Sequence, residues 1–215
     1  MENNNYKPKV LKFDVDWIAI KDACMQTIGK EAKGNEPSEE WKKKLLICKH
    51  SPIRRSLMSI KWDNIPSYVS THYCRHSVGV TPYVQTSRED RTGVPRNERV
   101  QTEMVSMQMD MNIQALFNIM EKRLCMCSDP TTIKYAEGLL EAIKEYDENI
   151  AWSCVPSGIA HGGCTEPFSN CKMCNKILER MTPEERLDIM KRYDAYNKYR
   201  EEVMTRKRVK ESDVK

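Results

Sequence analysis

The sequence lacks any long apolar run, and no window approaches the roughly 20 consecutive apolar residues that a membrane span needs. Its first ten residues, MENNNYKPKV, are polar and contain no apolar signal core, so we expect a cytoplasmic protein that is not exported. The net charge of +4 is also too small to argue by itself for a nucleic-acid partner, but it is compatible with a local cationic pocket. We therefore expect neither a membrane nor a nucleic-acid partner.

The length and composition of the chain suit a globular protein with a hydrophobic core. The 215 residues are 31% charged and 40% hydrophobic, and they contain no internal repeat. Composition shifts after Trp152, where cysteines gather, and again near Thr182-Pro183, where a highly charged helical stretch begins. We predict a main domain over 1–150, a cysteine-rich element over 151–178 and a charged helical tail over 179–215.

Periodicity predicts an α+β fold. Residues 56–62, SLMSIKW, alternate apolar and polar side chains as a strand does. Asp63, Asn64 and Pro66 resemble a cap and first turn. The segments with helical spacing are 15–30, about 38–48, 66–76, 103–123 and 131–150.

The stretch THYCRHSVGVTPYVQTSREDR, residues 71–91, concentrates arginine and histidine. His72, Arg75 and His76 fall at i, i+3 and i+4, on one face of the predicted helix. The hydroxyls and arginines of the following loop would suit an anion such as a phosphate. The alternative is a solvated loop with ordinary ion pairs. A metal bound by the two histidines is a further reading, but the nearby sequence supplies no third ligand.

The order of these features resembles that of the flavin-dependent thymidylate synthases. The match consists of CKHSP, a strand, an Ile-Pro helix ending in Arg75-His76-Ser77, and a loop ending in Thr86-Ser87-Arg88. The family signature is Arg-His-Arg-x-x-Ser-x-Asn-Glu-x-Ser-x-Arg-Tyr, and this chain carries one extra residue between its two ends. A second match lies downstream, where Asn112, Asn118 and Arg123 keep the separations of the family's long helix.

The resemblance covers roughly residues 48–143 and implies an α+β fold with an antiparallel sheet and helices. It also implies a flavin- and nucleotide-binding role for residues 1–150. Arg123 would be catalytic, because it matches the arginine that orients and polarises the pyrimidine. The other implied contacts are Ser51, Arg75, His76, Asn112 and Asn118 with FAD, and His72, Thr86, Ser87, Arg88 and Arg96 with dUMP.

The activity implied by the resemblance is reductive methylation of dUMP at C5. Methylenetetrahydrofolate would supply the carbon, reduced FAD the hydride, and NADPH the electrons that reload the flavin. The protein would supply binding and electrostatics, with Arg123 stabilising the negative charge that develops on the uracil. The family assembles as a homotetramer with active sites shared between subunits, so we expect a homo-oligomer here.

Departures from the signature keep two alternatives open. Ser77 replaces an arginine of the signature, and Tyr83 and Val84 lie about where the family has its Asn-Glu pair. Glu89 replaces the final tyrosine, and Gln114 replaces another arginine. One alternative is a related C5 substitution such as hydroxymethylation. The other is a zinc-stabilised nucleotide-binding module without catalysis.

Nine cysteines form two groups. Cys24, Cys48, Cys74, Cys125 and Cys127 are scattered, and we interpret them as small packed residues. The segment CVPSGIAHGGCTEPFSNCKMC instead has the short spacings of a structural zinc site. Its candidate ligands are Cys154, His161, Cys164, Cys171 and Cys174. Five candidates exceed the four places of tetrahedral zinc, and His161 or Cys154 is the one we expect to be unused. Reduced cysteines or a redox pair are the alternatives.

Overall fold

The protein is described by a computed structural model that covers residues 6–168 and 171–212, with side chains as far as Val203. Its elements in chain order are β1 Lys9–Asp14, α1 Trp17–Thr27, α2 Glu39–Cys48, η1 Ser51–Arg55, β2 Leu57–Pro66, α3 Ser67–Cys74, β3 Val80–Val84, α4 Glu89–Thr92, η2 Arg96–Glu98, β4 Met104–Met111, α5 Ile113–Arg123, α6 Pro130–Lys144, α7 Glu148–Ser153, α8 Ser157–Ala160, α9 Met173–Leu178, α10 Pro183–Leu187 and α11 Ile189–Ser212.

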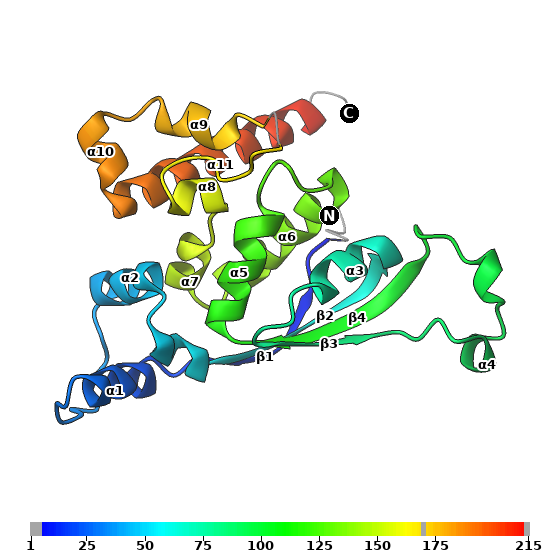
Figure 1. Ribbon diagram of the computed structural model, residues 1–215, viewed down its shortest axis with the longest axis horizontal. Coiled ribbons are helices and arrows are strands. Elements are labelled where there is room, and N and C mark those ends of the chain that lie inside the picture. Colours follow the sequence, from blue (N-terminus) through cyan, green and yellow to red (C-terminus); the bar gives the residue numbers. More distant parts are fainter. Residues whose placement is uncertain (1–5, 169–170, 213–215) are drawn as a thin grey trace.

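One antiparallel sheet of four strands, in the order β1-β2-β4-β3, organises the main domain. Helices α3, α5 and α6 lie along one face of this sheet (Figure 1). Met111 of β4 pairs with Val80 of β3 on one side and with Met58 of β2 on the other. The predicted fold class, α+β with an antiparallel sheet and helices, is therefore confirmed.

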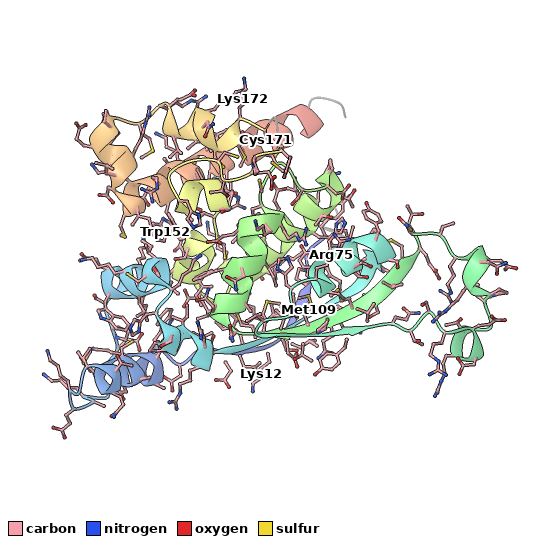
Figure 2. The ribbon with its side chains drawn as sticks, in the orientation of Figure 1. Lys12, Arg75, Met109, Trp152, Cys171 and Lys172 are labelled. Atoms are coloured by element: carbon pink, nitrogen blue, oxygen red, sulfur yellow. The ribbon has the colours of Figure 1, made fainter. Side chains whose placement is uncertain are left out.

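The two faces of the sheet differ because side chains alternate along each strand. On β4, Val105, Met107, Met109 and Met111 are buried beneath the helices, and Figure 2 shows Met109 on that side. On the other face, Asp110 Oδ1 accepts a hydrogen bond of 2.6 Å from the Ser59 hydroxyl. The sheet thus has one apolar side that forms the core and one polar side.

The helix predicted over 103–123 is wrong in its first half. Residues 104–111 form the central strand β4, and only Ile113–Arg123 is helical. The alternating burial of MVSMQMDM is a strand pattern, but its methionines have no β-branch and fit a helical stripe equally well. Asn112 separates the two elements by capping α5, since its side chain accepts a hydrogen bond of 2.9 Å from the Ala115 backbone N–H.

Several predicted boundaries also need correction. Asp63 and Asn64 belong to β2 and do not cap a helix; α3 ends at Cys74, so that His76 lies beyond it. The sequence pattern did not predict strands β1 and β3. Asp129 caps α6, and α1 and α2 lie where they were predicted.

The C-terminal part packs around its own apolar cluster. Val155, Ile159, Ile177, Tyr193 and Tyr196 form this cluster, which brings α8, α9 and α11 together. Figure 1 shows these helices as a layer beyond α5 and α6 on the side away from the sheet. The cysteine-rich element and the charged tail therefore pack on each other, while the division of the chain into three domains stays a prediction.

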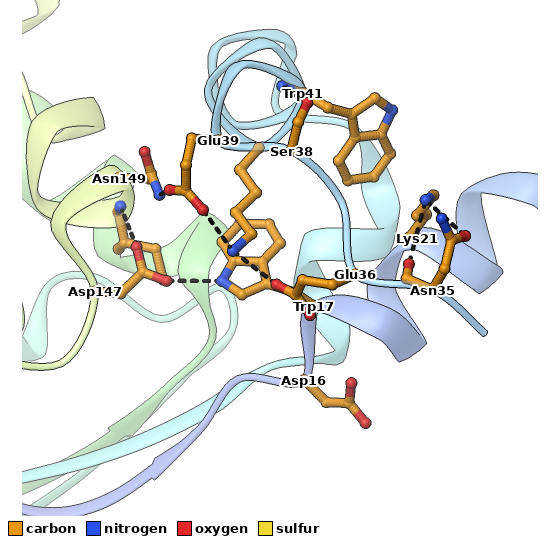
Figure 3. A network of polar contacts seen from close by, with 12 residues as sticks. Asp16, Trp17, Lys21, Asn35, Glu36, Ser38, Glu39, Trp41, Asp147 and Asn149 are labelled. Carbon is orange, nitrogen blue, oxygen red and sulfur yellow. Dashed lines mark hydrogen bonds and ion pairs between the residues drawn. The ribbon is translucent and has the colours of Figure 1, made fainter.

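Polar contacts attach the first two helices to α7 (Figure 3). Trp17 Nε1 donates to Asp147 Oδ2 over 2.7 Å, and Asn149 donates to Glu39 of α2. Lys42 is mostly buried and pairs with Glu36 and Glu39, at 2.7 and 3.0 Å. An open cleft of about 730 Å³ lies beside this network, lined in part by Glu39 and Asn149. In the residues that the structure describes, no helix combines the length and apolar character that crossing a membrane requires.

Candidate functional site

Helix α5 forms the axis of the candidate site, and two loop segments run beside it. On one side, Lys49 pairs with Glu121, and the Ser56 hydroxyl accepts a hydrogen bond of 2.9 Å from the Ile113 N–H. On the other side, the segment after α3 contacts the end of α5 through His76 and its beginning through Gly79. Residues 49–56 and 76–79 therefore both flank this one helix.

Arg123, in the last turn of α5, is held by two groups of the α3 segment. Its Nε donates to His76 Nε2 over 3.2 Å, and its Nη2 donates to the carbonyl oxygen of His72 over 2.5 Å. Burial is the main cause that lowers the pKa of the guanidinium, with Arg75 adding to the effect, but an arginine remains charged. Arg123 is therefore a fixed, partly buried cation whose Nε and Nη2 bind His76 and His72, while Nη1 contacts neither histidine.

His76 is neutral near pH 7. Burial lowers its pKa to about 4, with further contributions from Arg123 and Lys122. Because Arg123 donates to Nε2, that nitrogen must carry the lone pair and Nδ1 must carry the proton. His76 thus orients Arg123 as an acceptor and leaves an N–H donor on its other ring nitrogen.

His72 belongs to a short relay that ends on a carboxylate. Its Nδ1 lies 2.8 Å from Thr132 Oγ1, which in turn donates to Asp129 Oδ2 over 3.1 Å. The single hydroxyl hydrogen of Thr132 goes to the carboxylate, so His72 donates from Nδ1 and Nε2 is left as an acceptor. Burial is the main cause that lowers the His72 pKa, followed by Arg123 and Arg75, against Asp129.

The two predicted asparagines of α5 have local partners. Asn112 packs against Gly79, where an added Cβ would lie 2.9 Å from Asn112 Nδ2. Gly79 has φ of +72°, which an L side chain rarely adopts, so both its shape and its conformation suit glycine. Asn118 Oδ1 accepts a hydrogen bond of 3.2 Å from Gln114, the residue that replaces a family arginine.

Arg75 and Ser51 are exposed at the ends of the flanking segments. Arg75 follows α3 directly, and Figure 2 shows it beside the group of helices α3, α5 and α6. Ser51 begins η1, which packs against α5. The structure therefore brings Ser51, Arg75, His76, Asn112, Asn118 and Arg123 around one helix.

The predicted phosphate-binding residues lie elsewhere in the chain. Thr86, Ser87, Arg88 and Arg96 belong to the long excursion between β3 and β4, which carries α4 to the far end of the molecule from α5 (Figure 1). Arg88 forms a two-pronged pair with Asp90, at 2.9 and 2.8 Å. Within one chain, these residues do not reach Arg123.

The five predicted metal ligands are not assembled into a metal site. Cys154 is buried in the main core, where its thiol donates to the Ile150 carbonyl over 3.3 Å. His161 is exposed, with Nδ1 2.8 Å from the Ser157 carbonyl oxygen. Among the described residues, no group of three or more His, Cys, Asp or Glu side chains is placed to hold a metal ion.

Sequence reasoning missed Thr132, Asp129 and Tyr73. Thr132 is fully buried, and the Tyr73 hydroxyl is a buried polar group without a partner in the described contacts, close enough to influence Arg123. Only the sequence Asp-Pro-Thr-Thr at the start of α6 signalled a helix cap. Nothing in it indicated that the same threonine also contacts a histidine sixty residues earlier.

Comparison with known proteins supports the fold. No protein-family model matches the chain, and no curated protein matches it by sequence. Among solved structures, it is similar to the UMP/dUMP methylase PolB from Streptomyces cacaoi, a structure with bound 5-Br dUMP. The TM-score is 0.57 at 11% identity, and the match covers 68% of this chain and 93% of PolB. This level of likeness establishes a shared fold.

Proposed function

We propose that this protein alkylates C5 of a pyrimidine nucleotide, with reductive methylation of dUMP as the reaction. The observation that carries the proposal is the Arg123 guanidinium, which His76 Nε2 and the His72 carbonyl hold at the end of α5. The fold shared with a UMP/dUMP methylase supports the same substrate class. A fixed cation with spare N–H donors suits a uracil ring that becomes electron-rich at C5.

Arg123 would act on the base and not as a nucleophile. Its position is set before a ligand arrives, so little reorganisation is needed when negative charge develops on a pyrimidine oxygen. His76 accepts from Nε and keeps the plane of the guanidinium fixed. Arg75, exposed next to His76, would add a second positive charge for a nucleotide phosphate.

The residues around α5 also fit a flavin nucleotide. The Nδ1–H of neutral His76, the Arg75 guanidinium and the Asn112 and Asn118 amides are donors of the kind that bind phosphate and ring carbonyl groups. Reduced FAD would supply the hydride, methylenetetrahydrofolate the carbon and NADPH the electrons for reduction. The protein would bind and orient these molecules.

A second copy of the chain would complete the site. Arg88 and its neighbours lie on the projecting excursion, away from Arg123 of the same chain, yet both groups are proposed to bind one nucleotide. An excursion that reaches a neighbouring protomer would place a phosphate-binding arginine beside that protomer's Arg123. This arrangement is consistent with the homotetramer that the sequence resemblance implies.

Absorbance spectroscopy tests the proposal. The purified protein is mixed with FAD and then titrated with dUMP, and the flavin bands between about 300 and 550 nm are followed. We expect bound flavin whose bands shift on dUMP addition, and a loss of the dUMP shift in Arg123→Ala. Lys122→Ala is the matched control, because it removes an exposed cation from the same helical turn.

Other outcomes separate the alternatives. A wild-type protein that ignores FAD but binds dUMP would reject the flavoenzyme proposal and favour a nucleotide-binding module. A product that is heavier than dTMP by one oxygen atom in mass spectrometry would instead identify the hydroxymethylase.

A further inference from the structure

Five cysteines from three segments lie close together where the C-terminal part meets α5 and α6. Cys125 and Cys127 are on the connection between these two helices, Cys164 follows α8, and Cys171 and Cys174 are at the start of α9. Figure 2 shows Cys171 next to that connection. In the sequence, Cys125 and Cys127 had no evident relation to the Cys171-x2-Cys174 motif.

Specific contacts link the two motifs. The thiols of Cys125 and Cys171 each hydrogen-bond with the thiol of Cys127. Cys174 and Cys164 both pack against Gly158, where an added Cβ would lie 2.8 Å from Cys174 Sγ and 3.3 Å from Cys164 Cα. A glycine at this position allows the Cys164 and Cys174 segments to approach α8 closely.

A backbone N–H group lies against each of two sulfurs, where it would favour the thiolate that a metal requires. The N–H of Cys127 donates to the sulfur of Cys125, and the N–H of Met173 donates to that of Cys171. In both cases the donor follows its cysteine by two residues, so each motif folds around its own sulfur. Such outer-shell hydrogen bonds orient metal-binding side chains and stabilise their ionised form.

We propose that Cys125, Cys127, Cys171 and Cys174 bind one Zn²⁺ as a structural site between α5 and the C-terminal helices. The pattern is Cys-x-Cys with Cys-x2-Cys, four thiolates of the kind that closed tetrahedral zinc sites use. Cys164 lies beside the site without ligating the ion. Cys154 and His161, with their partners Ile150 and Ser157, have no part in it.

The described side chains do not form a metal-binding group as they stand. Neutral thiols share hydrogen bonds, and burial raises the pKa of Cys125 to about 11 and that of Cys174 to about 12, with neighbouring thiols adding to the effect. A dication reverses this preference. Each ligand releases one proton as its Zn–S bond forms, and the sulfurs rotate to about 2.3 Å from the ion.

The site has a structural consequence for α5. Cys125 is two residues beyond Arg123, so a metal bound there would fix the end of α5 against α9. Because the site is structural, its test does not depend on the proposed enzymatic function.

The test is elemental analysis of the full chain purified under reducing conditions. We expect one zinc per chain in the wild type and its loss in Cys127→Ser and Cys174→Ser. Cys48→Ser, Cys154→Ala and His161→Ala are the controls that should retain the metal, since Cys48 is exposed outside the cluster. Circular dichroism and size-exclusion chromatography show which variants remain folded.

A second measurement uses the wild type alone, in case the serine variants do not fold. Reaction with a thiol reagent before and after chelation should reveal the four additional thiols that the metal had protected. A metal-free wild type, a metal that survives loss of Cys127, or a Cys127–Cys171 disulfide without metal would overturn the proposal. Loss of metal on removing Cys154 or His161 would do the same.

Discussion

Lowering the pH should weaken the fold through His76 by an amount that the structure allows to be calculated. The folded-state pKa of about 4 lies below the ordinary value of 6.5, because burial and two neighbouring cations disfavour the charged ring. The unfolded chain therefore binds the proton first as the pH falls. The stability that the neutral ring gives is complete above the unfolded pKa and is lost as the pH falls toward the folded pKa.

The magnitude follows from the two pKa values. Linkage gives a loss of about 2 kcal/mol between pH 7 and pH 5 and about 3 kcal/mol by pH 4. His72 contributes in the same direction, since its pKa is also lowered, chiefly by burial. The His76 part is isolated by comparing the wild type with His76→Gln, whose amide oxygen can still accept from Arg123 but does not titrate.

Urea denaturation of both proteins at pH 7, 6, 5 and 4 measures this difference. The wild type should lose more stability than His76→Gln, with a gap of roughly 2 kcal/mol opening by pH 5. Parallel pH dependences for the two proteins would refute the inference that His76 is neutral and partly buried against Arg123.

Three further predictions test other contacts. In urea denaturation, Gly79→Ala should destabilise the protein by about 1–2 kcal/mol more than Gly93→Ala. Both glycines have a positive φ, but of the two only Gly79 has a neighbour, Asn112, in contact with an added Cβ. Equal losses of stability would contradict this packing. Asp90→Asn should tighten dUMP binding several-fold in calorimetry, because it releases Arg88 from a competing carboxylate. The control Glu89→Gln should change dUMP binding little. Equal dUMP affinities of the two variants would argue against Arg88 as a phosphate ligand. Thr132→Val should lower the pKa of His72, followed by NMR, and change that of His76 less, because the hydroxyl accepts from the His72 ring and does not contact His76. Equal shifts of the two histidines would contradict the relay.

Much of the grouping of residues around α5 could be predicted from the sequence, because these residues are close in sequence or match a family pattern. Arg75 and His76 adjoin each other, and Asn112 and Arg123 bracket a single helix. The contact between His76 and Arg123 depends on the turn after α3, which no local sequence pattern predicted. The resemblance to the thymidylate synthases grouped these residues, whereas periodicity placed Asn112 inside a longer helix.

The errors arose where tertiary packing outweighed local preference. Methionine suits a helix or a strand, so only pairing with β2 and β3 determines that β4 is extended. The excursion that carries Arg88 is adjacent in sequence to β3 but projects away from α5. Cys127 and Cys171 are likewise distant in sequence, and their contact follows from how the C-terminal helices pack.

Release of tritium from [5-³H]dUMP tests the central claim most directly, since any substitution at C5 must displace the hydrogen there. The protein is incubated with FAD, NADPH, methylenetetrahydrofolate and labelled nucleotide, and radioactivity in water is counted. We predict release that depends on the protein, falls by orders of magnitude in Arg123→Ala and persists in Lys122→Ala. Nucleotide that binds the folded, flavin-loaded protein without releasing tritium would contradict the account.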